Sequence, residues 1–329
     1  MAAGYVEYDG EFCFGVYADA LVFRHSSQSW HEVGRGLELL GSGDPEAAPS
    51  VDGPRFSQRM TREQFCGMVA RAQEYIAQGD IYQVSLSHPF FAPWHGDAFS
   101  LYEALRHYSP APNAAFLEFD GRAILSASPE SFLKMSGRAI RTRPIKGTRP
   151  RLAEANADAL SAYELRTSAK ETAELVMITD LERNDLGRVC EYGSVTVKEL
   201  LKIERFEQVY HLVSTVEGQL REDVDHIHAL RKCFPGGSIT GAPKKRAREI
   251  IAELESWPRG IYTGALGWLG FNGESQFNIA IRTAIIENGE AHFHVGAGIV
   301  ADSVPEQEWE ETLHKGAGIL LAAERFGLD

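Results

Sequence analysis

Two pairs of glutamates are spaced so that each pair shares one face of a helix. Glu171 and Glu174 are three residues apart, and Glu308 and Glu311 repeat this spacing near the C-terminus. The first pair continues toward Ile178 along one stripe, so it is expected to face the core, where carboxylates are costly unless paired or bound to a cation. Two such pairs could hold a hard cation, and a few carboxylates with water suit Mg²⁺. The alternative is two solvated helix faces with salt bridges.

A basic stretch, Arg-Thr-Arg-Pro-Ile-Lys-Gly-Thr-Arg-Pro-Arg at residues 141–151, stands out in a chain of formal net charge −13. Positive charge concentrated against a negative background indicates a small anionic ligand. Pro144 and Pro150 restrict the backbone on either side of Lys146, and Gly147 permits a positive φ or a close approach of main chain to ligand. A solvated basic hairpin is the simpler alternative for such a run.

Other polar residues could complete an anion site. Tyr262 and Arg282 are expected in neighbouring strands, where they could present a hydroxyl and a fixed cation to a carboxylate, although Arg282 could equally form a structural ion pair. Gly296 and Gly298 within a strand indicate a backbone approached by a ligand or another chain. His211 lies in an otherwise apolar strand and would by default be a core histidine.

A glycine-rich segment, Phe-Pro-Gly-Gly-Ser-Ile-Thr-Gly-Ala-Pro-Lys at residues 234–244, resembles a phosphate-binding loop only superficially. It lacks the adjacent Gly-Lys-Ser/Thr of that motif, which argues against nucleotide binding. A glycine-rich entry to a helix can still bind a carboxylate through backbone N–H groups.

The elements that must position these residues follow from alternation and turn signals. Strands are predicted within 5–23 and at 80–94, 113–126, 132–143, 194–203, 209–220, 262–271, 276–287 and 291–301. Helices are predicted at 61–79, from about residue 97, at 167–186, from about residue 225, at 244–255 and at 305–326, and 41–59 is expected to be a mobile connector. Hairpins separated by single helices predict an α+β fold with antiparallel sheets.

Bulk composition narrows the class of protein. The 329 residues are 44% hydrophobic and 24% charged, which is typical of a soluble globular enzyme. The net charge of −13 argues against nucleic acid as a partner, and no apolar run approaches the roughly 20 residues that cross a bilayer, so no membrane partner is expected. Four scattered cysteines are expected to be reduced thiols, which fits a cytoplasmic protein.

Six segments, in order, make the chain similar to the chorismate-utilising enzymes: anthranilate synthase large subunit, aminodeoxychorismate synthase component I, isochorismate synthase and salicylate synthase. The resemblance covers about residues 60–325 and rests on residues 79–87, 128–132, 143–151, 180–188, 235–244 and 296–303, followed by Glu308, Glu311 and Thr312. It implies the anthranilate synthase component I-like fold, with large antiparallel β-sheets packed together and helices outside. Residues 59–329 would form the chorismate-binding catalytic domain, and residues 1–58 a shortened N-terminal β region and linker without a tryptophan site.

The resemblance also implies roles for residues of this sequence. Lys146 would be the nucleophile and Glu130 the acid that protonates the leaving hydroxyl, which His211 would orient. Mg²⁺ would be held by Glu174 and Glu311, with Glu171 and Glu308 nearby. The substrate would be bound by Gly147, Thr148, His211, Tyr262, Arg282, Gly296, Gly298 and Lys315.

Two positions separate the reactions of this family. Anthranilate synthases typically have alanine where this chain has Lys146, and isochorismate and salicylate synthases have a base lysine at the position of Gln83. Lys146 with Gln83 therefore resembles aminodeoxychorismate synthase component I, which makes 4-amino-4-deoxychorismate for p-aminobenzoate and folate synthesis. No segment resembles a glutaminase, so a separate glutamine amidotransferase would supply ammonia. Anthranilate synthase component I and a catalytically silent chorismate-binding subunit are the alternatives. Ser85 departs from the asparagine common in relatives.

Overall fold

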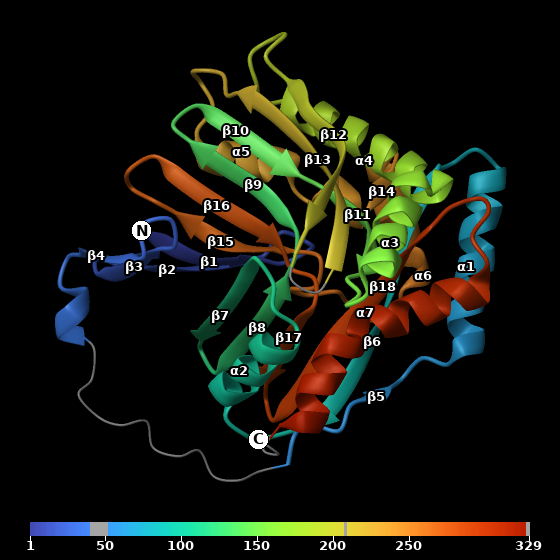
Figure 1. Cartoon of the computed structure of the whole chain (residues 1–329), viewed down its shortest axis with the longest axis horizontal. Helices are drawn as coiled ribbons and strands as arrows, with labels where there is room; N and C mark the ends of the chain where they lie inside the picture. The colour runs from blue at the N-terminus through green and yellow to red at the C-terminus, as the bar shows by residue number, and fades with distance from the viewer. Residues whose placement is uncertain (40–51, 207–208, 327–329) are drawn as a thin grey trace.

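The computed structural model describes residues 1–39, 52–206 and 209–326, so most of the predicted connector at 41–59 lies outside the described residues. The described chain is an α+β fold in which strands outnumber helices (Figure 1). The strands are β1 (Ala2–Val6), β2 (Phe12–Val16), β3 (Ala20–Arg24), β4 (Ser29–Val33), β5 (Ser57–Gln58), β6 (Gln83–Pro93), β7 (Asn113–Phe119), β8 (Arg122–Ser128), β9 (Ser131–Ser136), β10 (Ala139–Arg143), β11 (Ile145–Pro150), β12 (Thr196–Arg205), β13 (Val209–Gln219), β14 (Gly241–Ala242), β15 (Ala265–Leu269), β16 (Glu274–Ile279), β17 (Thr283–Glu287) and β18 (Glu290–Ile299).

The helices are α1 (Arg62–Ala77), α2 (Ala98–Tyr108), α3 (Ala155–Thr167), α4 (Ala169–Gly187), α5 (His226–Cys233), α6 (Lys244–Leu254) and α7 (Pro305–Arg325), with short 3₁₀ turns η1 (Gly36–Leu39) and η2 (Gly237–Ile239). Among the described residues, none of these helices is both long and apolar enough to span a membrane.

Two large antiparallel sheets organise the molecule. The nine-stranded sheet runs β11-β13-β10-β9-β16-β15-β1-β2, with β12 also paired to β13, and the seven-stranded sheet runs β14-β6-β18-β17-β8-β7, with β5 also paired to β6. The remaining pair, β3 and β4, forms a separate hairpin beside the N-terminal strands (Figure 1). The predicted fold of antiparallel sheets is therefore confirmed.

The sheets pack against each other through apolar side chains that alternate along their strands. Tyr5 on β1 and Leu266 on β15 belong to the nine-stranded sheet, and they share one buried cluster with Ile124 on β8 and Ile285 on β17 of the other sheet. Burying such side chains contributes on the order of 1.5–3 kcal/mol each. The two sheets therefore form one body, and residues at their junction are held at fixed positions.

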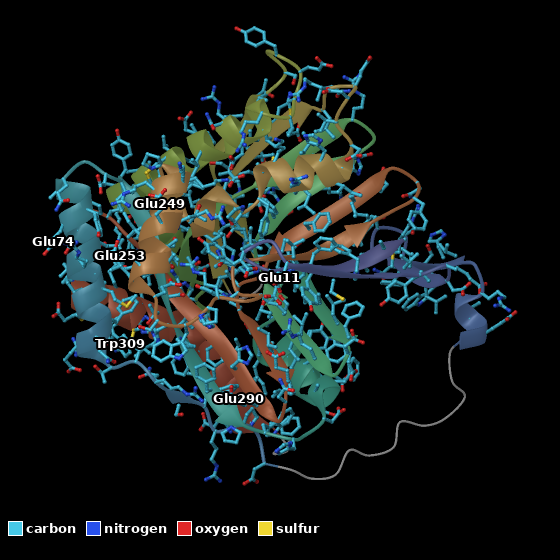
Figure 2. All side chains as sticks on the ribbon, turned by 180° about the vertical axis from the view of Figure 1, so that it is seen from behind. Glu11, Glu74, Glu249, Glu253, Glu290 and Trp309 are labelled. Atoms are coloured by element: carbon cyan, nitrogen blue, oxygen red, sulfur yellow. The ribbon has the colours of Figure 1, made fainter. Side chains whose placement is uncertain are left out.

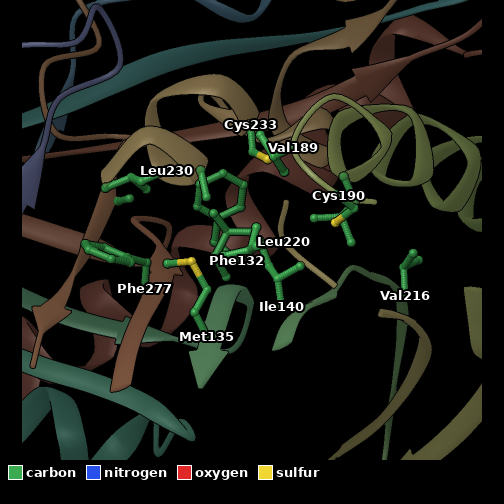
Figure 3. Packing of buried hydrophobic residues seen from close by; sticks show 14 of the residues in the cluster. Phe132, Met135, Ile140, Val189, Cys190, Val216, Leu220, Leu230, Cys233 and Phe277 are labelled. Carbon is green, nitrogen blue, oxygen red and sulfur yellow. The ribbon is translucent and has the colours of Figure 1, made fainter. Parts of the chain in front are cut away.

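Helices cover the sheet faces that point away from this junction. Figure 3 shows Phe132, Met135 and Phe277 of the nine-stranded sheet packed near Leu230 and Cys233 of α5. On the seven-stranded sheet, α1, α6 and α7 cover β6 and β18. Seen from behind in Figure 2, α1 lies beside α6, the helix that carries Glu249 and Glu253. The two helices are joined by the Tyr75 hydroxyl, which donates to Glu253 Oε1 at 2.6 Å.

One predicted strand is wrong. Residues 276–287 were expected to form a single strand, but they form the end of β16 in one sheet and all of β17 in the other. The break lies at 280–282, where Arg282 has a left-handed φ of 49°, far from the extended backbone of a regular strand. Both halves are apolar and alternate, so periodicity does not show the change of sheet.

Helix α3 was missed by the sequence analysis. Within it only Ser161 and Leu165 are buried, so its apolar stripe is too narrow to indicate a helix. The other predicted helices are present within a few residues of the expected bounds.

The beginning of α1 gives a direct test of a sequence-encoded contact. Thr61 caps the helix, as the Thr-x-x-Gln spacing to Gln64 favours: its hydroxyl accepts the Gln64 N–H at 3.3 Å, and Gln64 Oε1 accepts the Thr61 N–H at 2.8 Å. We expect Thr61→Ala to lower the free energy of unfolding by about 1 kcal/mol, measured by urea denaturation followed by tryptophan fluorescence. Thr61→Ser keeps the hydroxyl and should match the wild type, so equal losses in both variants would contradict this explanation.

Candidate active site

A cavity of about 470 Å³ lies where the two sheets meet α4 and α7, a size typical of small-molecule sites. Its walls come from β11 and β13 of one sheet, β6 and β18 of the other, and both helices. All but one of the predicted site residues line it: Glu130, Lys146, Gly147, Thr148, Glu171, Glu174, His211, Tyr262, Arg282, Gly296, Gly298, Glu311 and Lys315. The exception, Glu308, is buried behind the wall, with 2% of its surface exposed.

The basic stretch enters the cavity through a β-bulge at Gly147. The register of β11 against β13 shifts between Lys146 and Thr148, and Gly147 has a φ of 71°. A Cβ at Gly147 would lie 2.6 Å from Leu165 Cδ1 and 3.0 Å from Glu171 Oε2, so a larger residue does not fit. Bulges re-aim neighbouring side chains, and here both flanking residues line the cavity.

Only part of the basic stretch faces the cavity. Lys146 and Arg149 line it, whereas Arg143 pairs with Glu204 and Arg151 with Asp158 away from it. The stretch is therefore neither a solvated hairpin nor a uniform anion site. Some of its residues line the cavity, and others form ion pairs that stabilise the surrounding structure.

Lys146 and Glu130 are the two reactive groups on this wall. The Lys146 Nζ lies 3.9 Å from Glu174 Oε2, and both side chains are largely buried. Burial raises the pKa of Glu130, while a hydrogen bond from Ser238 and the charge of Lys146 oppose that rise. Glu130 therefore holds a proton more readily than an ordinary glutamate, as a general acid must.

The four predicted carboxylates each face a basic side chain. The pairs are Glu174 with Lys146 at 3.9 Å, Glu171 with Arg149 at 3.5 Å, Glu308 with Lys170 at 3.1 Å and Glu311 with Lys315 at 2.7 Å. Burial raises the pKa of Glu174, whereas at Glu311 the charges of Lys315, Lys170 and Lys146 outweigh burial and lower the pKa. Glu171, Glu174 and Glu308 are mostly buried, whereas Glu311 and Lys315 each keep 43% of the side chain exposed. The alternative of two solvated helix faces therefore does not describe the first pair and describes only part of the second.

These carboxylates fit a hydrated divalent cation. Glu308 Oε2 is buried without a hydrogen-bond partner among the described residues, so it can still accept a ligand. The charges of Glu171 and Glu311 raise the pKa of Glu174, although burial and the opposing charges of Lys146 and Lys170 have larger effects. Within the described part of the chain, no three acidic, histidine or cysteine side chains form a ready-made cage. Carboxylates from two helices with water in the remaining positions suit Mg²⁺ better than Ca²⁺.

Arg282 and Tyr262 present unpaired polar groups to the cavity. Among the described residues, neither the Arg282 guanidinium nor the Tyr262 hydroxyl has a hydrogen-bond or ion-pair partner, so the structural ion pair considered for Arg282 is wrong. Both residues lie in connecting segments rather than in neighbouring strands, because the chain leaves β16 before Arg282 and enters β15 after Tyr262. A desolvated guanidinium without a partner is a strong site for a carboxylate.

His211 is a buried histidine that also faces the cavity. It lies on β13 with 4% of its surface exposed, and its Nδ1 is 3.0 Å from Thr148 Oγ1. Burial lowers its pKa to about 4, and the nearby charge of Arg282 contributes. The ring is therefore neutral near pH 7 and can orient a hydroxyl group.

Several lining residues were missed by the sequence analysis. Lys170 and Arg149 neutralise glutamates, Ser238 bonds Glu130, and His294 stacks on Tyr262 with ring centroids 5.3 Å apart. For Lys170 the sequence held a signal, because it lies four residues before Glu174 on the same helix face. The others come together only through tertiary contacts.

We expect the His211 ring to stay neutral down to about pH 5 in the folded protein, whereas in the urea-unfolded chain it should titrate near 6.5. Because the folded pKa is the lower one, this ring reduces stability as the pH falls through the window from about 6.5 to about 4. Histidine-selective NMR at a range of pH values, with His211→Gln to assign the signal, measures this directly. A folded-state titration near 6.5 would contradict the burial argument.

The comparisons with known proteins agree with this geometry. A family model described as chorismate binding enzyme matches residues 4–321. Anthranilate synthase component 1 of Streptomyces coelicolor is 48% identical over 288 residues, which are 86% of this chain and 56% of that protein. Aminodeoxychorismate synthase component 1 of Bacillus subtilis is 44% identical over 287 residues, which are 87% of this chain and 61% of that protein.

The crystal structure of anthranilate synthase component I from Streptococcus pneumoniae matches with a TM-score of 0.87 and 33% identity, covering 97% of this chain and 80% of that one. The chain spans between half and two thirds of the length of the two curated relatives named above. The family model covers nearly all of the chain, and the arrangement of strands and helices matches that of the crystal structure. The chain therefore belongs to the chorismate binding enzyme family.

Proposed function

We propose that this chain is an aminodeoxychorismate synthase component I, which converts chorismate and ammonia into 4-amino-4-deoxychorismate for p-aminobenzoate and folate synthesis. The observation that carries the proposal is the amine of Lys146 in the cavity, on the same wall as Glu130. An amine there is a nucleophile, and anthranilate synthases typically have alanine at this position. Similarity alone does not separate the two reactions, because relatives of both kinds match at 44–48% identity.

The charges of the cavity suit a small dicarboxylate such as chorismate. Arg282 and the Tyr262 hydroxyl have no partner among the described residues, and Lys315 Nζ donates to the Gly296 carbonyl at 3.0 Å. We assign these three groups, with backbone at Gly147, Thr148 and Gly298, to the side-chain carboxylate of the substrate. Burial raises the pKa of Tyr262 far above its usual value, so its hydroxyl remains a donor.

In the first step the ammonium of Lys146 gives a proton to the solvent. The free amine then attacks ring carbon 2, the two ring double bonds shift, and the bond from carbon 4 to oxygen breaks. The protonated carboxyl of Glu130 gives its proton to the departing hydroxide, which leaves as water. The neutral ring of His211 orients that hydroxyl. Glu130 is ionised and the lysine is joined to the ring at the end of this step.

In the second step ammonia attacks carbon 4 and the bond from carbon 2 to the lysine nitrogen breaks, which returns Lys146 as a free amine that takes a proton back from the solvent. Glu130 takes a proton from the new ammonium group and recovers its starting state. The overall change is chorismate plus ammonia giving 4-amino-4-deoxychorismate plus water, so atoms and charges balance. We assign the supply of ammonia to a separate glutamine amidotransferase subunit, and we expect both to be cytoplasmic.

Glu174 and Glu311, with Glu171 and Glu308 beside them, would hold Mg²⁺, which when bound adds positive charge that attracts the ring carboxylate of the substrate. The basic partners of these glutamates balance their charge without the ion. Binding of the ion and of a dianion together would keep the buried site close to neutral.

The second candidate is anthranilate synthase component I, supported by the 48% identity to such an enzyme. In that reaction ammonia attacks carbon 2 itself, so Lys146 would occupy the position that the nucleophile needs. A catalytically silent binding subunit is disfavoured, because the reactive amine, the acid and both glutamate pairs are all present.

We expect Lys146→Ala to lower 4-amino-4-deoxychorismate formation by about 10³-fold or more, or to divert amination to carbon 2 and give anthranilate. The assay contains chorismate, Mg²⁺ and ammonium, and mass spectrometry after lyase treatment separates para from ortho aminobenzoate. Lys245→Ala removes an exposed lysine and should leave the rate unchanged. Unchanged product formation in Lys146→Ala would eliminate the nucleophile, and anthranilate from the wild type would favour the second candidate.

We expect Glu311→Gln and Glu174→Gln to raise the Mg²⁺ concentration for half-maximal activity by about tenfold or more, because each removes a negative charge from the ion's surroundings. Direct binding of Mn²⁺, followed by electron paramagnetic resonance, gives the same comparison without turnover. Glu249→Gln, an exposed glutamate of α6 seen in Figure 2, is the matched control. If the metal titrations of all variants coincide, these glutamates do not hold the ion.

A further inference from the structure

One buried acid takes no part in the mechanism above. Glu182 on α4 is 2% exposed and does not line the cavity. Its Oε1 accepts the Gly237 N–H at 2.9 Å, and its Oε2 accepts a hydrogen bond from the Thr142 hydroxyl at 3.3 Å. The glycine-rich segment thus binds a carboxylate through a backbone N–H, as expected from its composition, but the carboxylate belongs to the chain itself.

The turn η2 is packed tightly onto this carboxylate. A Cβ at Gly237 would lie 2.6 Å from Leu181 Cδ2 and 3.1 Å from Glu182 Oε1, so only glycine allows the approach. The end of the turn is anchored separately, because Arg259 NH1 donates to the Ile239 carbonyl at 3.1 Å. The middle residue, Ser238, is therefore held from both sides.

Ser238 connects the turn to the acid of the active site. It lines the cavity together with Glu130 and is 6% exposed, and its side chain lies close enough to the Glu130 carboxyl to lower the pKa of that group. A continuous set of contacts therefore runs from Glu182 through Gly237 and Ser238 to Glu130. We propose that Glu182 is a positioning residue for Glu130, acting through the turn Gly237–Ile239. This inference rests on the proposed function only in naming Glu130 as the general acid.

Glu182 and Glu130 are linked by their charges as well as by the contacts through the turn. Burial raises the pKa of Glu182 to about 7, the charges of Asp185 and Glu130 add to the rise, and Lys244 and the Gly237 N–H oppose it. Cys233 is buried against the same acids, and Lys244 bonds Asp185. Because a Coulomb interaction is mutual, an ionised Glu182 favours the protonated form of Glu130, which faces Lys146 and Lys315 on its other side.

Three substitutions separate positioning from general stability. Glu182→Gln keeps the shape and an acceptor for Gly237 but removes the charge, whereas Glu182→Ala removes the acceptor too. Ser238→Ala removes the link to Glu130. Asp180→Asn, an exposed acid on the same helix, is the matched control.

We expect Glu182→Gln to move the alkaline limb of kcat to lower pH by about half a unit, with less than a threefold change in the KM for chorismate. Glu182→Ala and Ser238→Ala should each lower kcat by about tenfold or more. The double variant should lose little beyond either single variant, because both substitutions interrupt the same set of contacts from Glu182 to Glu130. Asp180→Asn should leave kcat and its pH profile unchanged. Additive losses, or an unmoved limb in Glu182→Gln, would overturn the inference.

A readout without turnover keeps this test separate from the proposed function. The infrared band of the protonated Glu130 carboxyl, assigned by its loss in Glu130→Gln, should titrate at lower pH in Glu182→Gln than in the wild type. If the wild type produces no aminated product, the proposed function fails while this titration still decides about Glu182. If the band titrates identically in both proteins, Glu182 only stabilises the fold, and the inference is wrong whatever the reaction.

Discussion

Opposite charges gathered in one cavity, where the two sheets meet α4 and α7, are the interaction on which the rest of this structure depends. The basic residues Lys146, Arg149, Lys170, Arg282 and Lys315 and the acidic residues Glu130, Glu171, Glu174 and Glu311 all line one cavity. Glu130, Glu174 and Lys146 are largely buried, and each would be unfavourable there alone, since moving a lone ion out of water costs several kcal/mol. Together the charged residues of the cavity leave Arg282 as a cation without a carboxylate partner among the described residues, so the site is set to accept an anion.

This arrangement of basic and acidic side chains can bind an anion in one orientation only if the side chains stay at fixed positions. The two antiparallel sheets hold the walls of the cavity, and their shared cluster of Tyr5, Ile124, Leu266 and Ile285 prevents sliding. The bulge at Gly147 determines where Lys146 points, and the left-handed Arg282 sits where the chain crosses between sheets. The unusual backbone conformations of Gly147 and Arg282 persist because the regular strands on either side hold them.

The fold accounts for membership of the chorismate binding enzyme family, whereas a few side chains would determine which reaction is catalysed. Relatives with different reactions share this architecture, so the sheets and helices cannot carry the distinction. Under the proposed function, the amine of Lys146 and the neutral amide of Gln83 would carry that distinction. Glu182 does not line the cavity, yet through Gly237 and Ser238 it reaches the acid that the proposed reaction needs.

Much of this protein could be predicted from local patterns. The capping residues Thr61 and Gln64, the turn at Asp120-Gly121 and the glutamate spacing in two helices depend on neighbours in the chain, so propensity and periodicity reveal them. Many ordered motifs also identified the family. The sequence by itself therefore determined the type and order of most elements and the chemistry available.

Only the tertiary structure decided which of those groups meet. The change of sheet at 280–282, the partners of the buried glutamates and the contact of Glu182 with Gly237 join residues far apart in the chain. The pKa values of Glu130 and His211 likewise depend on burial beneath both sheets. The physical reason is that desolvation and ion pairing act through space, so a residue's charge state is set by neighbours that its position in the sequence does not reveal.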